Sequence, residues 1–436
     1  MTRPGRTRPQ PGAEDPATPA PPSLWRHRDF TTYWLGESAA RIGVQVTSLA
    51  LPLLAVVELD AGPTEAGLLN SAQFVPYLLL TLFAGVWVDR LRPRPFLIFT
   101  NLARALLLAL LPALFWLDAL TLAGLYAAGL VIGSLAVLYD LSSSTYLPSL
   151  IGKDRLAEGN SRIQGSGSVA RIAGPGVGGF LVQLMSVPAT LVVGAVVHLF
   201  SAIALFAVRT REERPVADGP PKPMLREIAG SLRFVVRNPY LRVAAFRAGF
   251  NNLFFMAMQT LLPLFVLREL GESSGTLGLV LAVGAVGSLI GAFLAVGVAR
   301  RYGPGRAIVL GFGLGSFSQA LVPLAGGPTF LVLAVLLGSF LLGGIGTTVG
   351  NIHLSTLTQT VTPARVLGRT NAALRFLTWG TMPVGALLGG WTGDLIGLRA
   401  ALLVTAAGFT VSLLLVAFSP VGRLTELPEE ARWDDE

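Results

Sequence analysis

The chain alternates long apolar blocks with short polar or basic segments. Each apolar block runs for about 20 residues, which as a helix crosses the ~30 Å hydrocarbon core of a bilayer. The blocks lack the apolar–polar alternation of a membrane β-barrel. The pattern therefore predicts an all-α membrane protein with twelve transmembrane helices. These are expected to begin near Tyr33, Glu65, Pro95, Leu120, Asn160 and Pro188, and then near Leu241, Ser274, Gly305, Thr329, Asn371 and Leu398.

The second half of the chain repeats the first at a constant offset. Pro52 corresponds to Pro263 (263 − 52 = 211) and Gly179 to Gly390 (390 − 179 = 211), and no insertion or deletion is needed between these two pairs. A single offset of this length indicates a duplicated membrane domain, and substrate sites in such proteins lie between the repeats. We take residues 25–208 and 241–420 as the two halves.

Composition agrees with a membrane location. Charged residues make up only 13% of the chain, whereas they make up about a quarter of soluble domains. The net charge of +8 comes from bases in short loops between apolar blocks, which argues against nucleic-acid binding. Cysteine is absent, so disulfides and thiolate metal sites are excluded.

The polar segments indicate an orientation. Residues 1–24 form a basic leader that is expected to be disordered and lacks the apolar region of a signal peptide. Bases gather in this leader, in alternate loops and in the linker 209–240, so the positive-inside rule places both termini and the linker in the cytoplasm. The opposite loops are acidic apart from Arg268 and Arg399, and residues 421–436 form an acidic tail.

Within the linker, the segment from Met224 to Arg237 has apolar residues at helical spacing with Arg226 and Arg233 between them. This pattern predicts an amphipathic helix on the anionic inner leaflet. The simpler interpretation, a tether between the halves, is preferred.

The first span carries a polar stripe. Glu37, Arg41 and Gln45 recur at intervals of four residues on one helix face, and Glu N-terminal to Arg is the better order for an ion pair. Intramembrane charges rarely occur without a partner or a role, so we expect the stripe to face a cavity. The alternative is an Arg that reaches the inner interface along its own stem.

Asp140 lies late in the fourth predicted span, inside an apolar stretch. Removal from water favours the neutral form of a carboxyl group, so a buried Asp could bind the proton that drives a transporter. The alternative is a carboxylate that pairs with an intramembrane Arg such as Arg104 or Arg171. Asp140 is thus a candidate for proton coupling.

The 211-residue offset relates these positions to polar residues in the second half. Arg41 corresponds to Asn252 and Asp140 to Asn351. In both cases a polar residue occupies the equivalent position of the other repeat. This predicts that the four residues line one cavity, from two pseudo-equivalent sides. Two further residues extend the predicted wall in the seventh span: Asn251 and Gln259.

Two other motifs stand out. The string Gly174-Pro175-Gly176-Val177-Gly178-Gly179 predicts a bent helix that packs closely on its neighbours. The segment that ends the second span contains Gly85, Asp89, Arg90 and Arg94. Its bases satisfy the positive-inside rule, but Asp89 needs another explanation, such as a gate that pairs with neighbouring helix ends.

Isolated histidines and the missing nucleotide motif narrow the function further. His198 and His353 have no metal-ligand spacing around them, so both are expected to be structural and no metal site is predicted. The chain has no Walker-type Gly-Lys-Ser/Thr sequence, which argues against an ATP-driven pump.

With these motifs the chain resembles the major facilitator superfamily over about residues 25–420. The span ending resembles the family's cytoplasmic loop motif G-x-x-x-D-R-x-x-R-[RK], here interrupted by Pro93, and the string at 174–179 resembles the G-P-x-x-G-G motif of its proton-antiporting drug exporters. Finer features, such as Leu49 to Pro52 and Tyr146 to Leu150, are similar to bacterial macrolide-efflux and enterobactin-exporter proteins.

The resemblance implies two six-helix bundles, alternating access and export of an amphipathic small molecule. It also implies a cytoplasmic gate at Asp89 and Arg90 and a helix kink at Gly174 and Pro175. The chain departs from the expected pattern at Asn101, where Asp is typical, and at Arg41, where Ser or Leu is typical. The second copy of the loop motif, at 299–301, lacks an acid. An Arg in the cavity suggests an anionic or zwitterionic substrate.

The sequence thus predicts a non-enzymatic exporter in the bacterial plasma membrane, monomeric and without a cofactor, which uses the proton gradient as its energy source. Its substrate would be a drug, an antibiotic or a secondary metabolite. One alternative is a dedicated siderophore or metabolite exporter, and another is a membrane sensor on the same fold that transports nothing.

Overall fold

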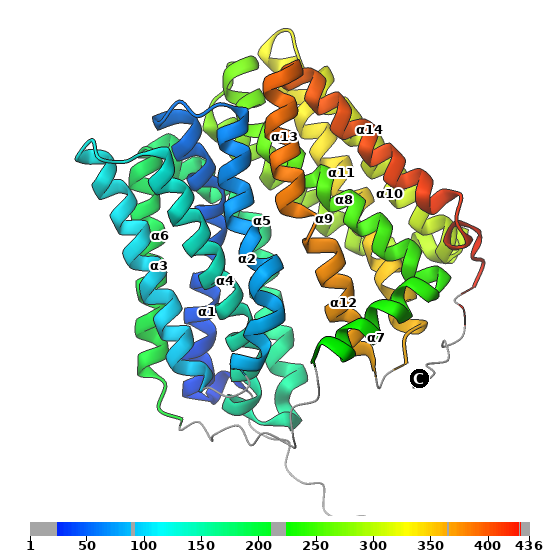
Figure 1. Cartoon of the computed structure of the whole chain (residues 1–436), viewed down its shortest axis with the longest axis horizontal. Helices are drawn as coiled ribbons and strands as arrows, with labels where there is room; N and C mark the ends of the chain where they lie inside the picture. Colours follow the sequence, from blue (N-terminus) through cyan, green and yellow to red (C-terminus); the bar gives the residue numbers. More distant parts are fainter. Residues whose placement is uncertain (1–23, 89–91, 211–223, 364–365, 427, 429–436) are drawn as a thin grey trace, which may run out of the picture.

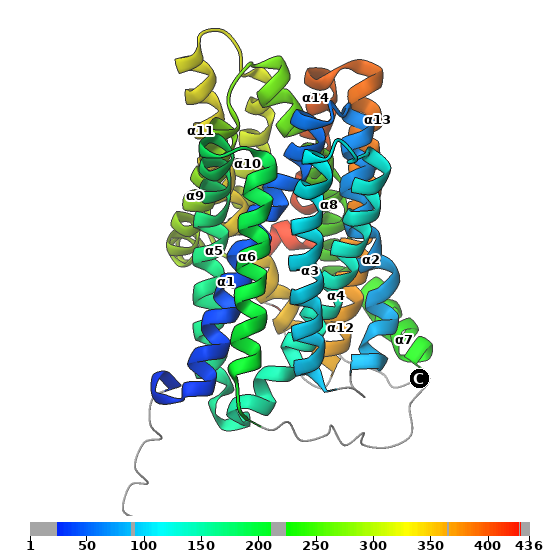
Figure 2. The ribbon, with the colours of Figure 1, turned by 90° about the vertical axis from the view of Figure 1, so that its left-hand side faces the viewer.

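The computed structural model describes residues 24–88, 92–210, 224–363, 366–426 and 428. Its helices form two groups that converge at one end and diverge at the other (Figure 1), and Figure 2 shows that they run along a common direction. The first group comprises α1 (Arg28–Leu53), α2 (Pro63–Val88), α3 (Pro93–Trp116), α4 (Leu122–Ile151), α5 (Leu156–Leu184) and α6 (Val187–Ala207).

The second group follows α7 (Met224–Arg237), which covers the segment predicted to be amphipathic. This group comprises α8 (Pro239–Leu264), α9 (Ser274–Tyr302), α10 (Pro304–Leu321), α11 (Thr329–Thr360), α12 (Leu367–Trp379), α13 (Met382–Ile396) and α14 (Leu398–Ala417). Every predicted span start lies within five residues of a helix start, the largest difference being at α1 (33 − 28 = 5). The predicted all-α membrane fold is confirmed.

The eleventh predicted span is divided into α12 and α13. Proline has no N–H to donate to the carbonyl four residues earlier, so Pro383 leaves the Trp379 carbonyl without its helical partner. The Thr381 hydroxyl donates to the carbonyl oxygens of Thr378 (2.8 Å) and Gly249 (2.9 Å), which fixes the junction to α8.

Nine of the described helices are long and apolar enough to cross a membrane by length and composition. Helix α5 is not among them, because it carries polar residues such as Asn160, Gln164 and Arg171. All three side chains line an internal cavity. The polarity of α5 therefore marks the interior of the molecule rather than a loop.

The 211-residue offset is preserved in the backbone. Helix α1 starts at 28 and ends at 53, and α8 starts at 239 and ends at 264, so both ends differ by 211. A π-helical turn follows each of them, at Leu54–Glu58 and at Phe265–Glu269. Beyond these turns Asp60 and its counterpart Gly271 both have positive φ, 50° and 68°. The duplication has thus kept local backbone geometry as well as helix order.

The two groups meet through small residues at the converging end. Helix α2 packs on α13 and α5 packs on α9. A Cβ atom at Gly67 would lie 2.6 Å from the Ala386 carbonyl oxygen, and one at Gly179 would lie 2.6 Å from Gly278 Cα. Apolar side chains in lipid gain little from leaving it, so close packing of small residues has to hold such helices together.

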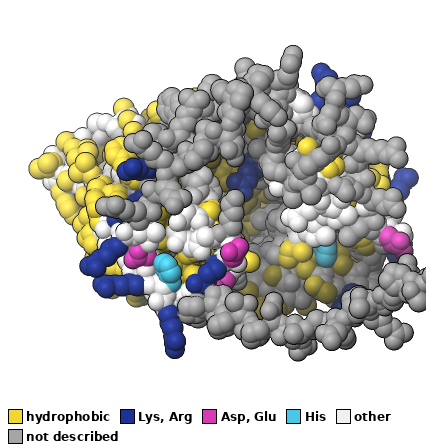
Figure 3. Space-filling model, turned by 90° about the horizontal axis from the view of Figure 1, so that it is seen from below, with side chains coloured by type: hydrophobic (Ala, Val, Ile, Leu, Met, Phe, Trp, Pro, Cys, Tyr) yellow, Lys and Arg dark blue, Asp and Glu magenta, His cyan; other side chains and the backbone are white. Residues whose placement is uncertain are grey.

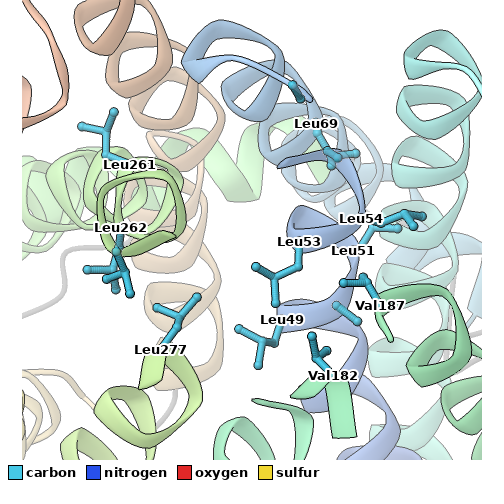
Figure 4. Packing of buried hydrophobic residues seen from close by; sticks show 14 of the residues in the cluster. Leu49, Leu51, Leu53, Leu54, Leu69, Val182, Val187, Leu261, Leu262 and Leu277 are labelled. Carbon is cyan, nitrogen blue, oxygen red and sulfur yellow. The ribbon is translucent and has the colours of Figure 1, made fainter. Parts of the chain in front are cut away.

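Polar bonds and a shared apolar core complete this contact. Arg268 of the second group donates to Asp60 (2.7 Å) and to the Val56 carbonyl (2.9 Å) of the first. The core cluster draws residues from both groups (Figure 4), including Leu49 and Leu53 of α1 and Leu262 of α8. Arg268, an exception to the predicted charge pattern, thus joins the two halves.

We predict that Gly179→Ala destabilises the protein by about 1–3 kcal/mol, since the added methyl group must displace backbone of α9. Gly165→Ala is the matched control in the same helix, because a Cβ there meets nothing within 4 Å, and it should be neutral or slightly stabilising. Thermal unfolding of the detergent-purified variants measures both effects. Equal unfolding temperatures would contradict the close approach of α5 and α9.

Candidate functional site

A cavity of about 630 Å³ lies inside the first group of helices and is closed on one side by α12. We call it the first cavity. It extends from Arg104 in α3 and Tyr77 in α2 toward Pro148 near the end of α4, so it reaches toward the diverging end of the two groups. Helices α1 and α5 contribute these polar residues to its walls: Glu37, Arg41, Gln45, Asn160, Gln164 and Arg171.

Glu37 and Arg41 form an ion pair in this cavity, with Arg41 Nε 2.8 Å from Glu37 Oε1. The Glu37 side chain is only 1% exposed, whereas that of Arg41 is 31% exposed. The Tyr139 hydroxyl of α4 donates to the second Glu37 oxygen. Both oxygens of the buried carboxylate are therefore satisfied, as burial of a charge requires. The spacing of four residues, which places Glu37 and Arg41 on one face of α1, brings the two side chains together.

Asp140 also lines the first cavity, but it is exposed there rather than buried as expected. It accepts a hydrogen bond from the Tyr77 hydroxyl (3.2 Å). None of the ion pairs among the described residues includes Asp140. Arg171 donates to Ser168 (2.9 Å), and Arg104 lies over the Tyr139 ring at 5.2 Å with its Nε unpartnered. In the structure, Asp140 therefore does not form the alternative ion pair with Arg104 or Arg171.

The first cavity has an excess of positive charge. Four arginines line it against two acids, Glu37 and Asp140, which gives 4 − 2 = +2 when all are ionised. One of the four, Arg375, and the neighbouring Trp379 come from α12 of the second half. Sequence reasoning missed both. Arg375 could have been found by the same criterion as Arg41, because each is a basic residue inside a predicted span.

The predicted wall in the second half belongs mostly to a separate space. Asn251 and Gln259 line a cavity of about 230 Å³ inside the second group, which we call the second cavity. Asn351 accepts a hydrogen bond from Arg247 of that cavity (3.1 Å). Asn252 lines neither cavity and donates to the Thr378 carbonyl of α12 (3.0 Å). The residues predicted to share one cavity are thus divided between two, because each group of helices encloses a space of its own.

The glycine string places α5 between α1 and α9. A Cβ at Gly174 would lie 2.4 Å from Gln45 Cβ, and one at Gly178 would lie 3.2 Å from a Leu49 methyl carbon. Gly179 faces α9, and Pro175 lies within an unbroken helix. The string therefore brings α5 against the polar stripe of α1 on one side and the other half of the molecule on the other.

The expected gate lies partly outside the described residues. Asp89 and Arg90 are not described, and Gly85 lies in the last part of α2, where only the helix is described. Arg94 donates to the carbonyl oxygens of Leu205 (3.0 Å) and Phe206 (3.1 Å). A cation at these positions complements the C-terminal end of α6, so Arg94 joins α3 to α6.

The two histidines predicted to be structural each lie at hydrogen-bond distance from a polar group. His198 Nδ1 lies 3.0 Å from Asn101 Oδ1 in the buried interior, and Asn101 in turn donates to the Leu97 carbonyl (3.0 Å). His353 Nε2 lies 2.9 Å from the Ala295 carbonyl oxygen. Asn101, which stands where Asp was expected from the family resemblance, is thus a neutral amide partner for the buried His198.

Two groups of membrane helices that enclose charged cavities define a multi-pass membrane transporter for a small molecule, not an enzyme. The sequence pattern of the Major Facilitator Superfamily matches residues 33–383. The chain belongs to this superfamily.

Similar proteins cover nearly the whole chain. The multidrug efflux pump Tap of Mycolicibacterium fortuitum is 29% identical over 404 residues, which span 89% of this chain and 94% of Tap. Tap of Mycobacterium tuberculosis (strain ATCC 25618 / H37Rv) is 26% identical over 91% of this chain and 94% of its own length.

Solved structures of low sequence identity share the fold. The inward-facing structure of a bacterial homologue of the iron transporter ferroportin has a TM-score of 0.70 at 18% identity, with 90% of this chain and 98% of that chain covered. The nucleoside transporter NupG has a TM-score of 0.70 at 13% identity, with 89% and 98% covered.

We predict unequal effects of removing either partner of the Glu37–Arg41 pair. Arg41→Gln leaves a buried carboxylate and should cost about 1–3 kcal/mol, a value discounted for the partial exposure of Arg41. Glu37→Gln should cost less, because the remaining guanidinium can turn toward the cavity. The double variant should recover part of the loss. Denaturant unfolding in detergent measures the coupling, and strictly additive losses would show that the two groups do not interact.

Proposed function

We propose that the chain is a bacterial inner-membrane exporter of drug-like, amphipathic small molecules that exchanges its substrate for protons. Its similarity over nearly the full length to proteins named multidrug efflux pump Tap supports export of drugs. The observation that carries the proton proposal is Asp140, an intramembrane carboxylate that is accessible in the first cavity and has no cationic partner among the described residues.

The proposed exchange uses competition at Asp140. When ionised, Asp140 can bind a cationic or hydrogen-bond-donating group of the substrate, while the surplus arginines of the first cavity bind an anionic group. Protonation removes the charge at Asp140 and weakens the first of these contacts. The Tyr77 hydroxyl, which donates to Asp140, holds the carboxylate toward the cavity. A substrate with both kinds of group is therefore favoured.

Alternating access would require the two halves to separate at the end where they now meet. Besides glycine packing and the shared apolar core, the contacts there include the Arg268–Asp60 pair and a bond from the Thr64 N–H to Asp394 (2.9 Å). Asp60 is almost fully exposed, so its ion pair contributes little to stability and can break readily. Such weak polar contacts suit an interface that opens and closes.

The proposed orientation puts the diverging end in the cytoplasm. The view of that end in Figure 3 shows Lys and Arg side chains among the described residues. The positive-inside rule favours the cytoplasm for such a face. Export would then start from the side toward which the first cavity extends, with both termini on that side.

The positive lining of the first cavity also favours a second candidate function. Four arginines against two acids suit a dedicated exporter of an anionic metabolite, such as an acidic siderophore. A drug pump and a metabolite exporter differ in breadth of substrate, which a panel of compounds separates.

The first test of drug export is growth inhibition of an efflux-deficient bacterial host. Expression of the chain should raise the inhibitory concentration of several structurally unrelated amphipathic drugs, and Asp140→Asn should abolish the protection at equal expression. Protection against a single acidic compound would favour the metabolite exporter. No protection against any member of a broad panel would contradict drug export.

Proton coupling is tested in reconstituted vesicles with an imposed pH gradient. We predict that a transported drug accumulates with the gradient in the wild type and that Asp140→Asn loses this dependence, because an amide cannot exchange a proton. Asp118→Asn is the matched control, since Asp118 lies in an exposed turn between α3 and α4 with positive φ, which Asn tolerates. If Asp140→Asn responds to the gradient as strongly as the control does, Asp140 is not the proton-binding group.

A further inference from the structure

Arg247 of α8 is a buried cation whose hydrogen-bond partners among the described residues are neutral. It is 5% exposed, and its two terminal nitrogens donate to Asn351 (3.1 Å) and Asn251 (3.1 Å). The guanidinium carbon lies 3.3 Å from the centre of the Phe312 ring. Nε has no hydrogen-bond partner among the described residues. Two of the five N–H groups of a guanidinium are thus used, and neither bond neutralises the charge.

No acid in the described part of the chain forms an ion pair with Arg247. Between residues 228 and 425 the sequence contains three acids, Glu269, Glu272 and Asp394. Glu269 is paired with Arg399 (2.8 Å), Asp394 accepts from the Thr64 N–H (2.9 Å), and Glu272 lies in the loop that follows α8. All three belong to the converging end of the molecule, whereas Arg247 lies in the opposite half of α8. An uncompensated buried charge costs several kcal/mol, so its presence needs an explanation.

The duplication supplies a comparison for this site within the same chain. The second cavity is the 211-residue counterpart of the first, since Thr347 corresponds to Ala136 and Ser288 to Tyr77 among their lining residues. At the position where the first cavity has Asp140, the second half has Asn351 (351 − 140 = 211). The first cavity thus has two acids of its own beside its bases, while the second has a base and, in place of Asp140, an amide.

The walls of the second cavity fit a small organic acid. Its 230 Å³ are bounded by phenyl rings and by neutral hydrogen-bonding side chains. The phenyl rings suit an apolar or aromatic body, and a guanidinium with free N–H groups suits a carboxylate. The lining residues that supply these two features are Phe255, Phe312, Phe340 and Phe409, and Asn251, Gln259, Gln319 and Thr347.

We propose that the second cavity is a binding site for a small organic carboxylate, with Arg247 as its counter-ion. The ligand would supply a negative charge beside Asn351, at the position where the first half has the acid Asp140 and the second half has only an amide. The site is distinct from the first cavity, and its existence does not depend on proton coupling or on drug export.

Thermal unfolding of the full-length protein in a carboxylate-free detergent buffer tests this site, with benzoate as the probe and benzamide as its neutral counterpart. Benzoate should raise the unfolding temperature and benzamide should not. Arg247→Gln should weaken benzoate binding about ten- to hundredfold, as expected for loss of a charged hydrogen-bond partner. Arg242→Gln, an exposed arginine on the same helix, should bind benzoate as the wild type does.

A second variant keeps the test decisive if Arg247→Gln does not fold. Asn351→Asp supplies an internal acid at the counterpart of Asp140, so it should pair with Arg247, raise the unfolding temperature without benzoate, and weaken benzoate binding about as much as Arg247→Gln does. The proposal is overturned if benzamide stabilises as well as benzoate, if both variants retain wild-type affinity, or if inorganic phosphate stabilises and benzoate does not. None of these results depends on an efflux phenotype.

Discussion

A charge placed inside a membrane needs a partner or access to water, and this constraint explains more of the structure than any other. Glu37 satisfies it with Arg41 and Tyr139, so that both carboxylate oxygens are bonded in the interior. Asp140 satisfies it by exposure in the first cavity. Arg247 satisfies it only in part, with amide oxygens and a phenyl ring. The three solutions are an internal ion pair, access to a cavity, and neutral hydrogen-bond partners.

The duplication kept the scaffold and let the chemistry diverge. Helix ends, π-helical turns and a positive φ recur at a spacing of 211 residues, because these features set how the helices pack. The charged residues that line the two cavities do not recur. Asp140 has become Asn351, and Arg247 stands where the first half has Gly36 (247 − 36 = 211). Two spaces of common origin can therefore bind different groups.

The helices could be predicted from the sequence because a block of apolar residues long enough to span a bilayer allows few alternatives. Local pairs were equally accessible, since Glu37 and Arg41 lie one helical turn apart. The break at Pro383 went unrecognised because the apolar pattern continues through it. Arg247 could not be paired in advance, since its partner Asn351 lies 104 residues away and an arginine near a helix end resembles a topology signal. Contacts between distant helices decide which polar residues share a cavity.

The π-helical turn at Leu54–Glu58 has a consequence for how the two halves can change over time. The Val56 carbonyl in this turn accepts a hydrogen bond from Arg268 of the other half. Every amino acid supplies a carbonyl oxygen at that position, so mutations at residue 56 preserve the acceptor as long as the turn keeps its shape. Drift in side chains near the cavities can then alter what is recognised while this backbone attachment stays intact. The hydrogen bond between Arg268 and the Val56 carbonyl therefore depends on backbone geometry at residue 56 and not on its side chain. Substitutions near the cavities can change substrate specificity without disturbing this bond.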